Sequence, residues 1–431
     1  MTRATPDPLG EPALDQPRRR AWRRAVTAVA IDLTPLRESR DFRLLFIGQG
    51  VSFAGSMITY VAVPFQAFAL THSSLVVGLI SLTELVPILL VAFVGGALAD
   101  VVDRRRMVLM TEVAMCVLTA VLVANAALPH PQLWLLFVVI AAAASVDALQ
   151  RPSLDALVPR IVSREHVPAA AALESLRGNL GQVLGPAIAG GLLAIAGLPV
   201  TFGVDVVTFG ASLTALALMR AVPPRDEGQR VSVRAVLDGV RYARRRQDLL
   251  GTYVVDMNAM FFGMPLALFP QIAAGFGGPA VLGLLYTAPS VGALVAATTS
   301  GWMRRVQRHG RAIALAAAAW GVAIIGFGFA PSLALALLAL AAAGAADMVS
   351  GLFRITIWNQ TIPDSMRGRL AGIEMISYSS GPGLGNLEAG VVGALAGVRA
   401  SVVSGGVLCV LGTVVLSAAL PRFWRYDAGR A

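Results

Sequence analysis

This chain of 431 residues contains no lysine, so all 35 of its basic side chains are arginines. A phosphate-binding loop of the GxxxxGK[ST] type requires a lysine near its end. The absence of lysine therefore excludes a nucleotide-driven motor of that type within the chain.

Cysteine and histidine are also scarce. The two cysteines, Cys116 and Cys409, lie far apart inside apolar runs, where a disulfide framework or a zinc site has little to build on. The four histidines fall in expected loops, so none is placed to pair with a nucleophile or a metal inside an apolar run. We therefore expect no enzymatic activity, no cofactor and no metal.

Charge is sparse as well. Only 14% of the residues are charged whereas 56% are hydrophobic, and the mean hydropathy of +0.71 is typical of a membrane protein. The net charge of +10 raises the possibility of nucleic-acid binding, but no soluble module with clustered arginines and aromatic residues is visible. We expect a lipid bilayer around the chain and no nucleic-acid partner.

Long apolar runs predict an all-α membrane protein with twelve transmembrane helices in two groups of six. A membrane-spanning helix needs about 20 mostly apolar residues. The first group comprises the runs 43–70, 75–99, 107–128, 133–157, 168–196 and 199–219. After an arginine-rich segment, the second comprises 250–274, 280–302, 312–330, 332–357, 369–395 and 399–420.

The connecting loops divide into an arginine-rich set and a nearly uncharged set. Short cytoplasmic loops carry basic residues, whereas outer loops do not. The arginine-rich loops place both termini in the cytoplasm of a multi-pass protein of the cell membrane, so much of the net charge is a topogenic signal. The expected parts are an N-terminal tail (1–41), a first half (42–219), a cytoplasmic linker (220–248), a second half (249–420) and a C-terminal tail (421–431).

Glycines and acids recur between the two groups of runs. The recurring pairs are Gly78 and Gly283, Gly96 and Gly301, Glu174 and Glu374, and Gly185 and Gly385. Parallel six-helix halves of this kind are used by transporters that rock around a central site near the middle of the bilayer.

The stretch GGALADVVDRRR at 95–106 joins the second and third runs. It resembles the loop signature of the major facilitator superfamily, G-x-L-a-D-r-x-G-r-[RK], whose matching positions are Gly96, Leu98, Asp100, Arg104, Arg105 and Arg106. Val101 replaces the usual basic residue and Asp103 the second glycine. The resemblance implies a cytoplasmic ionic latch that opens and closes as the halves rock. The alternative is a topogenic anchor in which Asp100 is incidental.

The fifth run carries a helix-bend motif, GNLGQVLGPAIAGG. It resembles the glycine-proline motif of exporters in the same superfamily, through Gly181, Gly185, Pro186, Gly190 and Gly191. Buried in a bundle, such residues permit a bend and close backbone contact. The alternative is a purely packing role.

Beyond these motifs, nearly the whole chain resembles the drug:proton antiporter branch that includes bacterial enterobactin exporters. The stretches that carry the resemblance include VAVPFQAFALTHSSLVVGL, LVPRIVSREHVPAAAALESLRGNLG and TIPDSMRGRLAG. The resemblance implies a secondary exporter of an amphipathic small molecule driven by proton antiport. We expect a siderophore as substrate, with multidrug or macrolide efflux as the alternative. A non-transporting membrane receptor is the alternative from another class. We expect a monomer.

Ionisable side chains inside the runs are costly, by about 2.5–3.5 kcal/mol on insertion scales, and are the candidates for proton coupling. They are Glu84, Asp147, Glu174, Arg177, Asp256 and Asp347. A proton carrier should be a buried acid with a displaceable cation nearby, which favours Glu174 beside Arg177 and Asp147 beside Arg151. Both are equally interpretable as neutral packing pairs. Asp205 and Glu388 are expected near the outer surface, where water would solvate them.

Aromatic residues predict an apolar substrate cavity. The candidates for contact with the substrate are Phe53, Tyr60, Phe261, Phe262 and Tyr378. Contact with lipid or packing within the bundle is the alternative for each of them.

Overall fold

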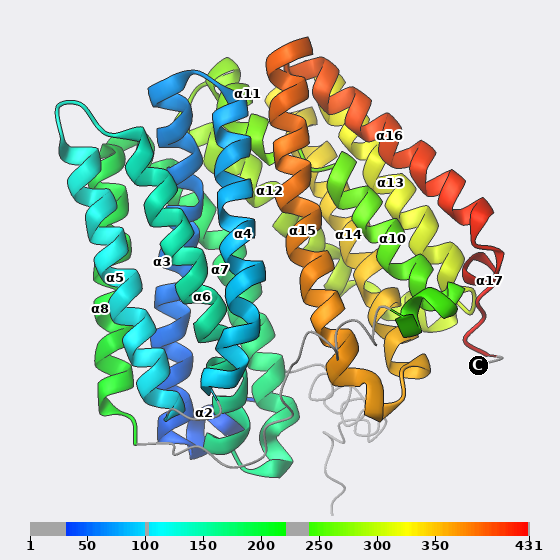
Figure 1. Cartoon of the computed structure of the whole chain (residues 1–431), viewed down its shortest axis with the longest axis horizontal. Helices are drawn as coiled ribbons and strands as arrows, with labels where there is room; N and C mark the ends of the chain where they lie inside the picture. Colours follow the sequence, from blue (N-terminus) through cyan, green and yellow to red (C-terminus); the bar gives the residue numbers. More distant parts are fainter. Residues whose placement is uncertain (1–31, 100–102, 221–240, 430–431) are drawn as a thin grey trace, which may run out of the picture.

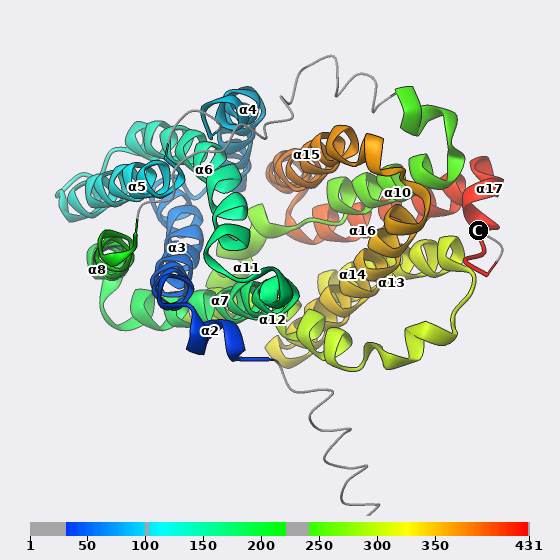
Figure 2. The same cartoon turned by 90° about the horizontal axis from the view of Figure 1, so that it is seen from below.

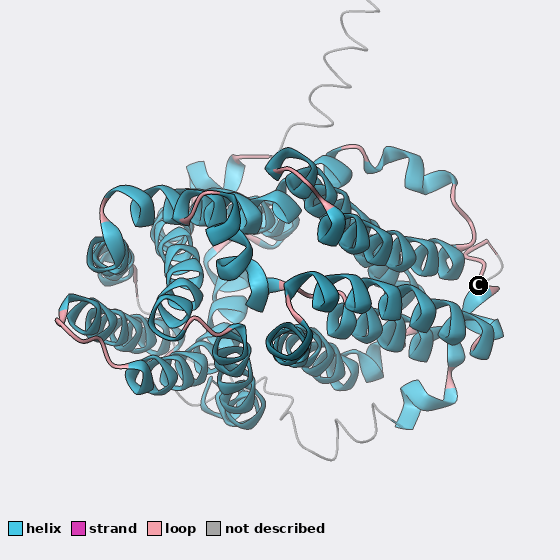
Figure 3. Cartoon of the chain, turned by 90° about the horizontal axis from the view of Figure 1, so that it is seen from above, coloured by secondary structure: helices cyan, strands magenta, loops and turns pink. Residues whose placement is uncertain are grey.

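The computed structural model describes residues 32–99, 103–220 and 241–429, and every regular element in these ranges is a helix (Figure 3). A chain in lipid must satisfy its backbone hydrogen bonds internally, which is why the apolar runs form helices. Large apolar side chains point outward from several of them. Leu90, Val207 and Leu338 expose 68%, 73% and 66% of their surface, as an apolar outer surface in contact with lipid requires.

The first half contains six long helices and two short elements. In chain order they are α2 (Thr34–Glu38), α3 (Arg40–Thr71), α4 (Ser74–Ala99), α5 (Arg104–Ala127), α6 (Leu133–Ile161), η1 (Arg164–His166), α7 (Val167–Ile195) and α8 (Gly197–Leu218). Side chains fix some of the helix starts. Ser39 accepts a hydrogen bond from the Phe42 N–H at 3.1 Å and caps α3.

The second half repeats this arrangement with more interruptions. Its elements are α10 (Gln247–Phe262), η2 (Leu266–Leu268), α11 (Phe269–Phe276), α12 (Pro279–Thr298), η3 (Ser300–Arg305), α13 (His309–Phe329), α14 (Leu333–Thr361), α15 (Asp364–Ala396), α16 (Val398–Ala419) and α17 (Pro421–Trp424). Figure 1 shows the two groups of helices standing side by side.

The structure interrupts the helix predicted over the run 250–274. Helix α10 ends at Phe262, and Pro265, which has no N–H to donate, lies in the interruption before η2 and α11. The Trp320 indole N–H donates to the freed Gly263 carbonyl at 3.1 Å and satisfies it. The eighth run is also shorter than predicted, because α12 ends at Thr298 and a 3₁₀ turn follows.

Eleven helices of the described residues are long and apolar enough to cross a membrane, with α10 and α11 counted as one. The further long helix is α15, whose 33 residues include a polar first part. Together these observations confirm the predicted all-α membrane fold of twelve spans in two six-helix halves.

The two ends of the bundle differ in charge. The arginine-rich end is where α3 and α5 begin, at Arg40 and Arg104, and it lies at the bottom of Figure 1. The bare end is where α4 and α6 begin, at Ser74 and Leu133.

The halves meet closely at the bare end, and we call this contact the seam. Gly78 in α4 lies against the Asn386 carbonyl in α15, where an added Cβ would approach to 2.7 Å. Gly190 in α7 lies against Gly283 in α12, where it would approach Cα to 2.8 Å. From the seam the ribbons of α4 and α15 diverge (Figure 1), and α11 is visible between the halves from the arginine-rich end (Figure 2).

Candidate functional site

A cavity of about 700 Å³ lies inside the first half. Helices α3 to α8 supply most of its wall, and four residues of the second half contribute at the bare end: Leu266, Ala267, Tyr286 and Asn386. Toward the arginine-rich end the wall continues to Val158, Pro159 and Val167. The cavity therefore extends from the seam toward the arginine-rich end.

Hydrogen bonds between described residues join the halves at or near the seam. The Ser74 hydroxyl donates to the Gln271 side chain at 2.6 Å, and the Asn386 amide donates to the Ser81 hydroxyl at 3.2 Å. Nearer the middle, the Thr287 hydroxyl donates to the Val183 carbonyl at 3.3 Å. These neutral contacts cover the bare end of the cavity.

Glu112 in α5 is a buried acid that sequence reasoning missed. The residue is only 2% exposed. Its carboxylate accepts hydrogen bonds from the Gln49 and Gln150 amides at 2.9 Å and from the Ser52 hydroxyl at 3.1 Å. The signal was present, since Glu112 is a lone acid in the predicted run 107–128. Three donors surround the carboxylate, and no cation among the described residues pairs with it.

Glu174 and Arg177 form an ion pair on one face of α7, as their spacing indicated. Arg177 Nη2 lies 2.6 Å from a Glu174 carboxylate oxygen, and the side chains are 19% and 24% exposed. Arg177 also donates to the Gln49 carbonyl at 2.9 Å and lies 5.8 Å from the centre of the Phe53 ring. The arginine thus connects α7 to α3.

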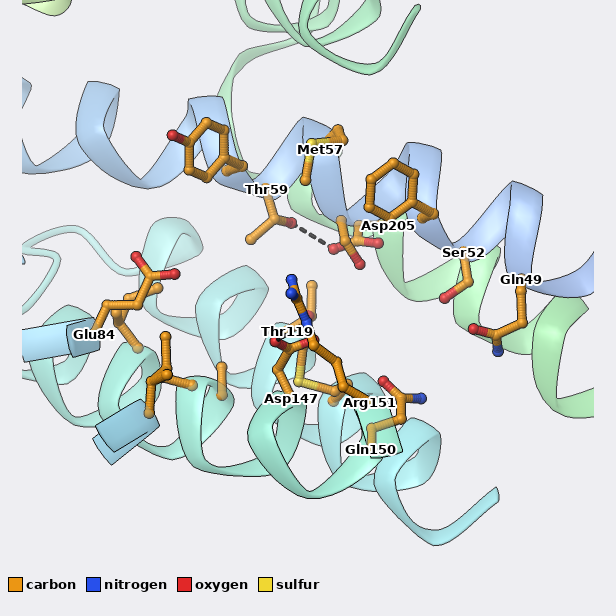
Figure 4. Close-up of a pocket in the computed structure, with 18 of the residues that line it drawn as sticks. Gln49, Ser52, Met57, Thr59, Glu84, Thr119, Asp147, Gln150, Arg151 and Asp205 are labelled. Carbon is orange, nitrogen blue, oxygen red and sulfur yellow. Dashed lines mark hydrogen bonds and ion pairs between the residues drawn. The ribbon is translucent and has the colours of Figure 1, made fainter. Parts of the chain in front are cut away.

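Asp147 and Arg151 lie one turn apart on α6 and also form an ion pair, at 3.0 Å. Both line the cavity, with 40% and 66% of their side chains exposed. Glu84 in α4 lines the same cavity from another wall (Figure 4). Among the described residues it has no hydrogen-bond or ion-pair partner.

Asp205 in α8 is buried, so the expectation that it lies near the outer surface in contact with water is wrong. It is 1% exposed and lies roughly 12 Å from the bare end of its helix, at 1.5 Å per residue. The Thr59 hydroxyl contacts one carboxyl oxygen at 2.5 Å and the Thr208 hydroxyl contacts the other at 3.1 Å. Gly55 makes room for these groups, since a Cβ there would lie 2.5 Å from Asp205 Oδ1.

The second half holds its own cluster of charges. Arg354 in α14, which sequence reasoning also missed, forms an ion pair with Asp256 in α10, and both side chains are 12% exposed. The same arginine lies 3.6 Å from Asp347, which is two turns earlier on the same face of α14 and has a side chain that is 43% exposed. These two predicted acids therefore share one cation.

The arginines of the 95–106 motif bind helix ends within the first half. Arg105 donates to the Leu216 and Ala217 carbonyls at 2.6 and 2.7 Å, which caps the end of α8. Arg104 donates to the Ala156 carbonyl at 3.0 Å. Asp103, which departs from the family pattern, caps α5 by accepting from the Arg106 N–H at 2.9 Å. Gly96 lies in α4, and Asp100 lies outside the described residues.

The glycines of the helix-bend motif bring α7 close to its neighbours. An added Cβ would lie 2.4 Å from the Phe53 ring at Gly181 and 2.3 Å from Met57 at Gly185. Gly190 contacts Gly283, whereas Gly191 has nothing within 4 Å of an added Cβ. Helix α7 continues through Pro186.

The predicted cavity aromatics separate into two groups. Phe53 and Tyr60 line the cavity, and the Tyr60 ring packs edge-on against Tyr286 of the other half, at 5.6 Å between centroids. Phe261, Phe262 and Tyr378 lie outside its wall. Within the described residues, no cluster of three histidine, cysteine or acidic side chains is suited to a metal.

Comparison with known proteins places the chain among membrane transporters. The family model described as "Transmembrane secretion effector" matches residues 30–428. Proteins named enterobactin exporter EntS are similar over 90% of this chain and 93% of their own length. Identity is 28% over 395 residues for Shigella boydii (strain Sb227) and 27% over 389 residues for Citrobacter koseri.

Solved structures share the fold at low sequence identity. A bacterial homolog of the human lysosomal transporter Spinster, in an inward-facing and unoccupied conformation, has a TM-score of 0.70 at 14% identity and covers 90% of this chain and 98% of its own. A POT family transporter in complex with 5-aminolevulinic acid has a TM-score of 0.70 at 12% identity, covering 89% and 97%.

Proposed function

The chain belongs to the transmembrane secretion effector family of the major facilitator superfamily, and from that premise we propose that it exports an amphipathic small molecule in exchange for protons. The family and the relatives are transporters, so this is a multi-pass membrane transport protein rather than an enzyme. To this transport function the proposal adds the direction of transport, the ion that drives it and the substrate.

The direction follows from the arginine-rich end, which we assign to the cytoplasm. Short cytoplasmic loops are enriched in basic residues, and this end carries the arginines 104–106 together with Arg160 and Arg164. With this orientation both termini are cytoplasmic. The structure then corresponds to an inward-open state, in which the cavity receives substrate from inside the cell.

The cavity is the observation that supports the proposal most strongly. Its volume of about 700 Å³ falls within the range of about 300–1,000 Å³ that holds drug-sized ligands. Phe53 and Tyr60 supply apolar surface, and Glu84, Asp147 and Arg151 supply charge. Such a wall suits an amphipathic molecule, and membrane-embedded acids are the groups that carry protons in pumps and transporters.

A siderophore is the first substrate that we propose. It rests on the name of the relatives, which are enterobactin exporters similar to this chain along almost its whole length. Enterobactin itself is the probe with which to begin.

Efflux of a cationic drug is the second candidate function, and Glu84 favours it. This carboxylate lines the cavity without a partner among the described residues. A positively charged amphipathic molecule would neutralise it, whereas an anionic one would be repelled.

Inverted membrane vesicles test both functions. With an acidic interior, they should accumulate enterobactin, or ethidium if the drug function holds, and collapsing the pH gradient with nigericin should abolish accumulation. Vesicles without the protein are the control. Accumulation that persists after the gradient collapses would exclude antiport. Binding of a probe without any uptake would identify a receptor instead.

A further inference from the structure

Asp205 differs from Glu174, Asp147, Asp256 and Glu112 in the groups that surround it. Glu174, Asp147 and Asp256 each contact an arginine, and Glu112 accepts from two amides and a hydroxyl. In the part of the chain that the structure describes, the hydrogen-bond partners of the Asp205 carboxyl group are hydroxyls, those of Thr59 and Thr208. A carboxylate buried without a cation is costly, and the cost is removed if the group takes up a proton.

The hydroxyl contacts fit a protonated Asp205. Thr208 Oγ lies 2.7 Å from the Asp205 backbone carbonyl and 3.1 Å from Asp205 Oδ1. A hydroxyl has one proton to donate, and the nearer carbonyl takes it. When Oδ1 is protonated, its O–H can donate to Thr208 Oγ, whose own proton stays directed at the nearer carbonyl. The Thr59 hydroxyl donates to Oδ2.

The same hydroxyls can also serve the charged form. A threonine O–H rotates and acts as donor or acceptor, so Thr208 can turn its proton toward a deprotonated Asp205. Glu112 is different, because the Gln49 and Gln150 N–H groups donate to it and stabilise the carboxylate. Of these two acids, Asp205 is the one whose surroundings accommodate both protonation states.

The position of Asp205 gives its proton a route. It and Thr59 line the cavity, on the wall opposite Asp147 and Arg151 (Figure 4). Gly55 of α3 leaves the space that the carboxyl group and Thr208 occupy, since a Cβ there would lie 2.0 Å from Thr208 Oγ. A larger residue at position 55 would close this pocket.

The other ionisable groups near Asp205 are few. Those on α5 are Glu112 and Cys116. The charge of Glu112 acts on Asp205, and the charge of Asp205 acts on Cys116. Helix α3 presents Gly55 and Thr59, which are uncharged. A negative Glu112 disfavours a second negative charge on Asp205.

We propose that Asp205 is the carboxyl group that carries the exchanged proton, a role that rests on the antiport proposed above. In the outward-open state an external proton adds to Oδ1 and forms the neutral acid. In the inward-open state the O–H bond breaks, the proton passes to water in the cavity and the carboxylate returns. No other bond changes in this cycle.

Proteoliposomes containing Asp205→Asn test the assignment. Asparagine has the shape of the acid but releases no proton. We expect uptake driven by a pH gradient to be lost, for enterobactin or ethidium, while exchange of labelled for unlabelled substrate remains measurable. Glu388→Gln is the matched control, since it replaces an acid on α15 outside the cavity wall, and it should retain both activities.

The outcomes separate the two proposals. Gradient-driven uptake retained by Asp205→Asn removes the role of Asp205 and leaves antiport standing. Absence of gradient-driven uptake in the wild-type protein removes both.

Thr208→Val gives an answer even if Asp205→Asn fails to reach the membrane. Loss of a hydroxyl that donates to the Asp205 carboxylate makes the charged form less stable, so the pH of half-maximal gradient-driven uptake should move upward. Thr214→Val, on the same helix with its hydroxyl on the Gly210 carbonyl, is the control. An unchanged midpoint in Thr208→Val contradicts the proposal.

Discussion

At the scale of residues, arginines pair with several acids of the bundle. Arg177 lies against Glu174, and Arg354 lies between Asp256 and Asp347. A nearby cation attracts the charged form of an acid, which suits a structural or positioning role. An acid whose partners can both donate and accept, as the hydroxyls around Asp205 can, is better suited to gain and lose a proton.

Glu174→Gln distinguishes the acid favoured by the sequence from the one favoured by the structure. If Asp205 carries the proton, the variant should keep its pH-gradient coupling. It should lose stability by about 1.5–3 kcal/mol, the usual contribution of a hydrogen bond to a charged group, because Arg177 loses its counterion. Thermal unfolding in detergent and uptake at several pH values are the measurements. Loss of coupling would instead support Glu174 as the carrier.

The sequence predicted which acids pair with an arginine, but it did not predict that the unpaired Asp205 is buried. Spacing of three or four residues places Glu174 beside Arg177 and Asp147 beside Arg151 on a helix face, and the structure contains both pairs. Burial of Asp205 depends on how α3 packs against α8 at Gly55. That contact joins residues far apart in the chain, so hydropathy along one run does not predict it.

At the scale of elements, glycines set how closely helices approach. The apolar runs predicted the helices well, because length and hydropathy are properties of a single segment. They did not predict the break between α10 and α11, which depends on Pro265 and on the Trp320 side chain that satisfies Gly263. Which glycine of a motif makes a contact also depends on the neighbouring helix.

Gly190→Ala compared with Gly191→Ala tests this point on adjacent residues. The added methyl at position 190 meets the Gly283 backbone, whereas at 191 it meets nothing within 4 Å. We expect Gly190→Ala to destabilise the closed seam by about 1–3 kcal/mol, as overpacking does. In a cysteine-free background, Ser81→Cys should then react faster with a thiol reagent applied from outside. Equal rates in both alanine variants would contradict the expectation.

At the scale of the whole molecule, the proposed export by alternating access requires the two halves to separate at the seam. Ser81 in α4 and Asn386 in α15 are hydrogen-bonded across it. A transporter that alternates between two open states cannot work with this contact fixed.

The double variant Ser81→Cys with Asn386→Cys, in a cysteine-free background, should therefore lose transport on oxidation and regain it with a reductant. Each single variant, treated in the same way, is the control. Vesicle uptake before and after oxidation is the measurement, with disulfide formation followed by mass spectrometry. Undiminished uptake by the fully crosslinked protein would exclude alternating access through this seam.

The hydrogen bonds at the seam are all between uncharged groups, from Ser74 to Gln271 and from Asn386 to Ser81, and glycine backbones pack around them. Within the described residues no ion pair bridges the halves there. Dissolved ions weaken attraction between exposed charges, most strongly beyond about 10 Å at 0.1 M salt, but they act little on contacts of this kind. We therefore expect the seam to stay closed equally well at low and at high external salt concentration. Raising the external osmolarity with sodium chloride or with sucrose should then have the same effect on export.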